Sequence, residues 1–139
     1  MENSLQEGVL LRGRDLKNMK KNIYLVDDDE HIRMLIEFLL GDIGFEVSGC
    51  STAAGFQQRM EQSLPDLVIL DIILPDGNGL EICRELKSNN ATSHIPVFLM
   101  SANLDNKMIA KAASADGFFS KPFDINDFAE KVQQKIAGL

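Results

Sequence analysis

Short apolar runs alternate with amphipathic segments along most of this chain, and no other feature of the sequence constrains its fold as strongly. The runs are far too short to span a bilayer and have the length and composition of strands. Strict alternation of strands and helices is typical of a parallel sheet with helices on both faces. We predict strands at residues 23–26, 45–48, 67–70, 97–100 and around 118–119.

The segments between these runs carry apolar residues at helical spacing. Gly44 should end the first helix, and the fourth should cover residues 104–113. The side chains that we expect to cap the second, third and fifth helices are Ser51, Asn78 and Asp124. The methionines that we expect to fill the core are Met34, Met60, Met100 and Met108.

Crossover connections between parallel strands are right-handed, which limits the possible topologies. The first, third and fourth runs are almost continuously apolar, as in strands that are buried on both faces. The flavodoxin-like strand order 2-1-3-4-5 fits best. We therefore predict a three-layer α/β/α sandwich around a five-stranded parallel sheet, with the first and last helices on one face and the other three on the opposite face.

The length and charge of the chain limit the number of domains and the kinds of partner that we expect. Its 139 residues suit one domain at residues 22–139, after a flexible N-terminal extension at residues 1–21. Residues 22–139 hold nine Lys/Arg and eighteen Asp/Glu, a charge that repels nucleic acid and anionic membranes. We thus expect neither as a direct partner. The chain ends soon after the last predicted helix, so we also expect no output domain in it.

The two cysteines, Cys50 and Cys83, lie far apart and form no CxxC motif. No secretory signal precedes the first predicted strand. We therefore expect two free thiols and a cytoplasmic protein.

Polar side chains follow four of the predicted strands at the point where each strand ends. Asp27-Asp28-Asp29 follows the first, Asp71 the third, Ser101 the fourth and Lys121 the fifth. The carboxyl ends of parallel strands meet at one edge of the sheet, so these groups should surround one cleft. Two carboxylates 4 Å apart repel by roughly 4 kcal/mol at an effective dielectric constant of 20. An all-oxygen set of this kind favours Mg²⁺ or Mn²⁺ over zinc.

Five marks that occur in this order resemble response-regulator receiver domains, and the resemblance covers residues 22–139. Each mark lies at its own position relative to a predicted strand. They are Asp27-Asp28, Asp71 before Ile72-Ile73-Leu74-Pro75, Gly79, Ser101-Ala102 and Lys121-Pro122-Phe123.

The resemblance implies that Asp71 accepts a phosphoryl group from a histidine kinase or a histidine phosphotransfer protein. Asp28, Asp71 and the main-chain carbonyl of Ile73 would ligate Mg²⁺, and Asp27 would hold a metal-bound water. Lys121 would pair with the phosphoryl group.

The resemblance also implies a switch. Ser101 would move toward the phosphoryl group, and Phe118 would turn inward. The surface formed by the fourth helix, the fifth strand and the fifth helix would then bind a downstream protein. A homodimer is also compatible with the sequence. The peptide bond before Pro122 is expected to be cis.

Four residues depart from the family pattern. Asn78 stands where aspartate is frequent, and its expected role as a helix cap explains it. Ser114 stands where glycine is usual, which bears on the turn before the last strand. Phe118 lacks the hydroxyl of a tyrosine, so its movement would depend on packing. Ile73 is apolar and cannot orient an attacking water, and on that basis we expect slow self-dephosphorylation.

Three other functions are compatible with parts of the sequence. Asp27-Asp28-Asp29 matches the start of haloacid-dehalogenase-type phosphatases, although Glu30 and His31 continue that motif poorly. A flavodoxin has a similar order of elements, but the triply acidic first loop opposes an FMN phosphate. A receiver-like module that binds partners without phosphorylation is the remaining alternative.

Overall fold

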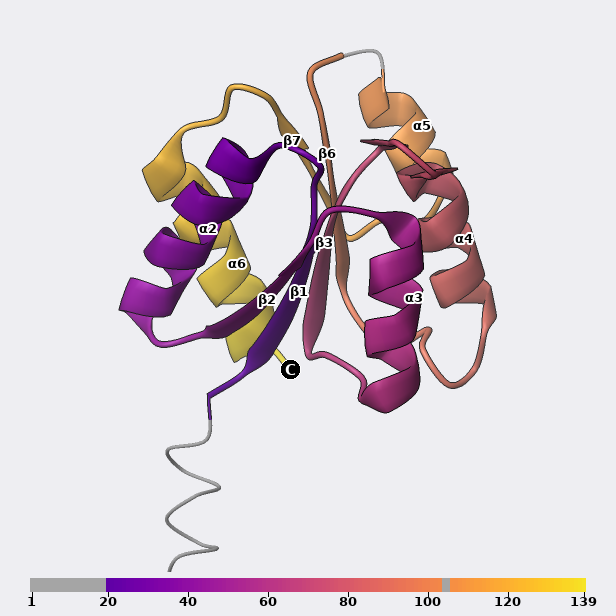
Figure 1. Ribbon diagram of the computed structural model, residues 1–139, viewed down its shortest axis with the longest axis horizontal. Coiled ribbons are helices and arrows are strands. Elements are labelled where there is room, and N and C mark those ends of the chain that lie inside the picture. Colours follow the sequence, from indigo (N-terminus) through magenta and orange to yellow (C-terminus); the bar gives the residue numbers. More distant parts are fainter. Residues whose placement is uncertain (1–19, 104–105) are drawn as a thin grey trace, which may run out of the picture.

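The structure, a computed structural model, describes residues 20–103 and 106–139 as a sheet between two layers of helices (Figure 1). The strands of the sheet are β1 (Asn22–Val26), β2 (Glu46–Cys50), β3 (Leu67–Asp71), β6 (Val97–Ser101) and β7 (Gly117–Ser120). The helices are α2 (Glu30–Ile43), α3 (Ala53–Gln62), α4 (Gly79–Ser88), α5 (Asn106–Ala112) and α6 (Ile125–Ala137). A two-stranded ribbon of β4 (Ile73–Leu74) and β5 (Gly77–Asn78), which the sequence did not predict, leads from β3 to α4.

The five strands lie in the order β2-β1-β3-β6-β7, and all neighbouring strands are parallel. This is the predicted order 2-1-3-4-5, so the flavodoxin-like fold is confirmed. The register places Val26 beside Leu70 and Asp71 beside Met100. Side chains that follow β1, β3, β6 and β7 consequently come together at one edge of the sheet.

The sheet separates two hydrophobic cores. Helices α2 and α6 cover one face and α3, α4 and α5 cover the other (Figure 1). Alternate residues of β1 serve different cores, since Leu25 packs under α2 and α6 while Tyr24 packs under the opposite helices. Burial on both faces explains why the central strands are apolar throughout. On the α6 side, the buried Phe128 ring lies 4.5 Å from the Phe119 ring and 4.7 Å from the Phe123 ring.

Most of the predicted helix ends are confirmed. Gly44 follows the last residue of α2 with a φ of 120°, a backbone conformation that favours glycine. Asn78 and Asp124 cap α4 and α6. The predicted cap of α3 is wrong by one residue, because Thr52 rather than Ser51 accepts the Gly55 N–H, at 3.0 Å. The fourth predicted helix corresponds to α5, which ends at Ala112, one residue earlier than expected; residues 104–105 of that prediction lie outside the described residues.

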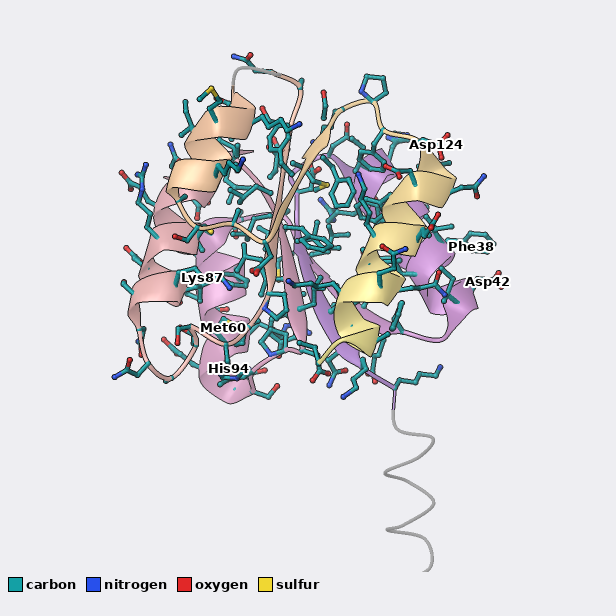
Figure 2. The ribbon with its side chains drawn as sticks, turned by 180° about the vertical axis from the view of Figure 1, so that it is seen from behind. Phe38, Asp42, Met60, Lys87, His94 and Asp124 are labelled. Carbon is teal, nitrogen blue, oxygen red and sulfur yellow. The ribbon has the colours of Figure 1, made fainter. Side chains whose placement is uncertain are left out.

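Two of the four methionines predicted for the core are on the surface. Met100 is fully buried, and Met60 packs partly buried against the core. Met34 and Met108, however, are 62% and 81% exposed. The apolar residues of α2 spread beyond the stripe that the sheet can cover, and Phe38, which projects from the outer side of α2 in Figure 2, is 75% exposed.

Nearly all of the expected N-terminal extension lies outside the described residues; of it, only Lys20 and Lys21 are described. The Lys21 carbonyl accepts a hydrogen bond from the Glu46 N–H at 2.9 Å, beside the start of β1. Within residues 20–103 and 106–139, no helix has the length and apolar character needed to cross a membrane.

Ser114, in the turn two residues after α5, has a backbone conformation that suits glycine better than serine. Its φ is 64°, in the left-handed region. The Ala115 N–H bonds back to the Ala110 carbonyl at 3.1 Å, closing a turn in which glycine is the usual residue. The left-handed region costs a residue with a Cβ about 1 kcal/mol.

We therefore expect Ser114→Gly to raise the free energy of unfolding by about 0.5–1 kcal/mol, because glycine removes the Cβ penalty. Ser114→Ala is the matched control, since it removes the hydroxyl and keeps the Cβ. Urea denaturation of the three proteins measures the difference. Equal stability of the Gly and Ala variants would show that the backbone at Ser114 carries no penalty.

Candidate functional site

Two carboxylates lie buried where β1 and β3 end. Asp27 follows β1 and is fully buried, and Asp71 is the last residue of β3 and is 7% exposed. Asp28 is exposed beside them. Each of these three side chains offers a carboxylate oxygen, and the three oxygens lie within 4.8 Å of one another. The predicted meeting of the acidic strand ends thus occurs in the structure.

Lys121 joins the two buried carboxylates. Its Nζ donates to Asp27 Oδ2 at 2.7 Å and to Asp71 Oδ2 at 2.6 Å. The lysine directly follows β7, and its backbone N–H donates to the Ser101 carbonyl at 2.8 Å. The Lys121–Pro122 peptide is cis, as expected. This lysine therefore reaches across the end of β6 to the ends of β3 and β1.

Burial and ion pairing act against each other in this group. Burial raises the pKa of Asp27 because it disfavours the charged carboxylate, and the hydrogen bond from Lys121 offsets only part of that effect. Burial lowers the pKa of Lys121, but the hydrogen bonds to Asp27 and Asp71 outweigh it, so this pKa is raised overall. The lysine is accordingly held in its charged form.

Backbone N–H groups hold the second oxygen of each buried carboxylate. Asp27 Oδ1 accepts from the Asp29 N–H at 2.9 Å, and Asp71 Oδ1 accepts from the Ile73 N–H at 3.0 Å. These bonds fix the orientation of both carboxylates. The Asp28 carboxylate makes no hydrogen bond or ion pair with the parts of the chain that the structure describes.

The third aspartate of the acidic run has a structural role. Asp29 is the N-cap of α2, and its Oδ1 accepts from the His31 N–H at 2.9 Å and the Ile32 N–H at 3.2 Å. The hydrogen bond from Ile32, followed by that from His31, lowers the pKa of Asp29. The acidic run therefore supplies two residues of the site, Asp27 and Asp28, and one helix cap, Asp29.

Gly79 lets α4 start directly against the end of β3. Its N–H donates to the Ile72 carbonyl at 2.8 Å. A Cβ at position 79 would overlap the Asp71 carbonyl oxygen and crowd the Ile72 Cα. Ile73 lies in β4 beside this turn, and its side chain is 70% exposed.

Ser101 connects the site to α5. It is 1% exposed at the end of β6, and its Oγ accepts from the Asn103 N–H at 3.1 Å and from Asn106 Nδ2 at 2.8 Å. Both lone pairs are thus occupied, which leaves the hydroxyl proton to be donated. Asn106 is the first residue of α5.

Phe118 does not lie in the acidic site. It pairs with Leu99 in the middle of β7 and packs, partly buried, against the core beneath α3, α4 and α5. Its ring also lines the surface on both sides of β7. The structure therefore brings together the predicted Asp27, Asp28, Asp71 and Lys121, with Ser101 next to them, but not Phe118.

Two contacts at the site were not predicted. Arg33 Nη1 donates to the Asp27 carbonyl at 2.8 Å, and Asn106 holds Ser101. Both are polar side chains on helices, and no local pattern marks them. Asp76 was also missed; it accepts from the Ala53 and Ala54 N–H groups at 2.7 and 3.0 Å and so binds the start of α3.

The donor set suits a hard divalent cation. All three ligand candidates are carboxylates, without a histidine or cysteine among them. Mg²⁺ prefers oxygen ligands and keeps several waters, which the exposed position of Asp28 permits.

Comparisons with known proteins agree with this geometry. The family model "response regulator receiver domain" matches residues 23–133. The transcriptional regulatory protein GltR of Pseudomonas aeruginosa is 33% identical over 81% of this chain and 48% of its own length. The regulatory protein VanRB of Enterococcus faecalis is 34% identical over 83% of this chain and 52% of its own length. The chain thus spans about half the length of these relatives.

Solved structures give the same result. The CheY-like receiver domain protein from Methanospirillum hungatei has a TM-score of 0.77 and is 28% identical over 86% of this chain and 95% of that chain. The BeF3-activated DrrB receiver domain has a TM-score of 0.75 and is 28% identical over 84% of this chain and 97% of that chain. The match of its sequence, its fold and its acidic strand ends together show that the chain belongs to the response regulator receiver domain family, the signal-transducing domains of two-component systems.

Proposed function

We propose that Asp71 accepts a phosphoryl group from a histidine kinase or a histidine phosphotransfer protein. The observation that carries this proposal is the position of the Lys121 ammonium between Asp27 and Asp71. One ammonium faces two buried carboxylates, and the exposed carboxylate of Asp28 has no partner among the described residues. Three carboxylates thus face one ammonium, which leaves the group two positive charges short, and a divalent cation would supply them.

Asp28, Asp71 and the main-chain carbonyl of Ile73 would hold Mg²⁺, with Mn²⁺ as a substitute, and Asp27 would bind a metal-bound water. The cation would offset the negative charge of the incoming phosphoryl group. Lys121 and the Asp29 N–H already fix the Asp27 carboxylate. Asp27 would therefore orient the metal-bound water without itself moving.

An oxygen of Asp71 would attack the phosphorus of a phosphohistidine. The new P–O bond forms as the P–N bond breaks, and the departing imidazole takes a proton. Lys121, which bonds Asp71 Oδ2 before transfer, would then pair with a phosphoryl oxygen. The Ser101 hydroxyl, whose lone pairs accept from Asn103 and Asn106, has its proton to donate to the same group.

Reorientation of Ser101 would carry the signal outward. Its bond to Asn106 lies at the start of α5, so a change in Ser101 would alter how α5 sits on β7. Phe118, between α5 and α6, would turn inward as space opens. The downstream protein would bind the face formed by α5, β7 and α6. Signalling through this face, rather than turnover of a separate substrate, is the activity that we propose.

Phosphorylation can be measured by intact mass after incubation with acetyl phosphate and Mg²⁺. We expect one added phosphoryl group in the wild type, none in Asp71→Asn, and a large decrease when EDTA replaces Mg²⁺. Asp76→Asn is the matched control and should still be phosphorylated, since Asp76 accepts from the first N–H groups of α3 and lies outside the acidic cluster. An unchanged wild-type mass with several donors would leave the receiver-like module without phosphorylation as the better account.

The phosphoryl group should be long-lived. The exposed side chain beside Asp71 is that of Ile73, which cannot accept a hydrogen bond from an attacking water. We expect loss of the phosphoryl group over many minutes or longer, followed by mass after removal of the donor. Ile73→Asn should speed the loss by at least about tenfold, because a positioned polar group assists water attack, whereas Ile73→Leu should change it little. A wild-type lifetime of seconds would contradict this expectation.

A further inference from the structure

We infer that the surface formed by α5, β7 and α6 binds an acidic segment of a partner protein that also carries an apolar side chain. We call this surface the lysine face and define its cationic residues as Lys107, Lys111, Lys131 and Lys135. The inference deepens the proposed function by giving the chemistry of the downstream partner. Its dependence on phosphorylation rests on that function, whereas its charge preference does not.

Two hollows flank the outer edge of β7. One, of about 180 Å³, lies between α5 and β7 and is lined by Lys107 and Lys111 among others. The other, of about 370 Å³, lies between β7 and α6 and is lined by Lys131 and Lys135 among others. Both hollows share Phe118. They therefore form neighbouring parts of one surface, which faces the viewer in Figure 2 with α5 and α6 on either side of β7.

The sheet is open at this surface. β7 is the last strand in the order and pairs with β6 alone among the described strands. Phe118, which lines both hollows, is only partly buried there. An apolar side chain of a partner therefore has apolar surface to contact.

The charge of the lysine face is opposite to that of the rest of the domain. Residues 22–139 hold eighteen Asp/Glu and only nine Lys/Arg, yet four of those nine cations line the two hollows. Lys107 and Lys111 form no ion pair with residues 20–103 or 106–139. Lys131 pairs with Asp127 at 3.2 Å, but both side chains are about half exposed, so this pair contributes little.

Among the described residues, Asp116 is the one acidic residue that lines the hollows, and both of its carboxylate oxygens already have partners. Its Oδ2 accepts from the Val97 N–H at 2.7 Å and pairs with Lys87 Nζ at 2.7 Å. Its Oδ1 lies 3.5 Å from Lys135 Nζ. Asp116 therefore anchors the start of β7, while Lys107 and Lys111 have no acidic partner among the described residues.

This charge selects among possible occupants. A second copy that used the same face on a two-fold axis would bring lysines against lysines, which is unfavourable. Nucleic acid would meet four lysines on a domain whose excess of acidic residues repels phosphates. An acidic segment of a protein can satisfy the lysines with only a few negative charges, so it meets less repulsion from the rest of the domain than nucleic acid would. Its apolar side chain would contact Phe118.

The lysine face is connected to the acidic site. Asn106 donates to Ser101 and immediately precedes Lys107 in α5. Movement of Ser101 toward a phosphoryl group would thus reposition α5, and with it two of the four lysines. We therefore expect the phosphorylated chain to bind the acidic segment more tightly than the unphosphorylated chain.

The test uses the full chain and three fluorescein-labelled 16-residue peptides with the same leucine positions. In the first the polar residues are mainly Glu, in the second Gln, and in the third Lys. We expect the Glu peptide alone to bind, with affinity that falls as salt is raised. Lys107→Glu combined with Lys131→Glu should weaken binding at least tenfold. Arg84→Glu, the same kind of charge reversal at one exposed position on α4, should change it less than twofold.

Equal binding of the Glu and Gln peptides would overturn the inference. An equal loss of affinity in Arg84→Glu and in the double lysine variant would do the same, and so would the absence of binding of all three peptides in both phosphorylation states. Dimerisation in sedimentation that the double variant abolishes would assign the face to a second copy instead. Thermal melts check that the variants fold. If Asp71→Asn binds the Glu peptide but acetyl phosphate has no effect on the wild type, the charge preference stands and the proposed phosphorylation switch fails.

Discussion

The bridge from Lys121 to Asp27 and Asp71 is the interaction on which the rest of the site depends. Two buried carboxylates this close would repel by roughly 4 kcal/mol at 4 Å and an effective dielectric constant of 20. The bridge can form only if β1, β3, β6 and β7 end at the same level, because the lysine arm has to pass the end of β6. The strand order and register of the fold are thus requirements of the chemistry.

The same arrangement explains how one site can affect a distant surface. Lys121 follows β7 and Ser101 ends β6, so the two strands that carry the site also support α5 and the lysine face. A chemical change at Asp71 would act on Lys121 and Ser101 together. Through Asn106 it would reach α5 without any rearrangement of the central strands, which are fully buried.

Much of the fold and of the site could be predicted from the sequence, because the meeting of the strand ends depends on chain order alone. Parallel strands bring their carboxyl ends together, so a polar residue after a strand, such as Asp71, can be assigned to a site from its place in the chain. The partners of Arg33 and Asn106 could not be predicted, since they depend on how helices pack. Met108 was placed wrongly because helical spacing does not show how wide a stripe the sheet covers.

The central claim is that Asp71 is the residue that carries the phosphoryl group. Borohydride reduction of the phosphorylated chain tests it most directly, because it converts an aspartyl phosphate to homoserine at the modified position. Peptide mass spectrometry should then find homoserine at position 71, dependent on both Mg²⁺ and the phosphoryl donor. Homoserine at Asp27 or Asp28, or a stable phosphate on a serine such as Ser101, would contradict the account.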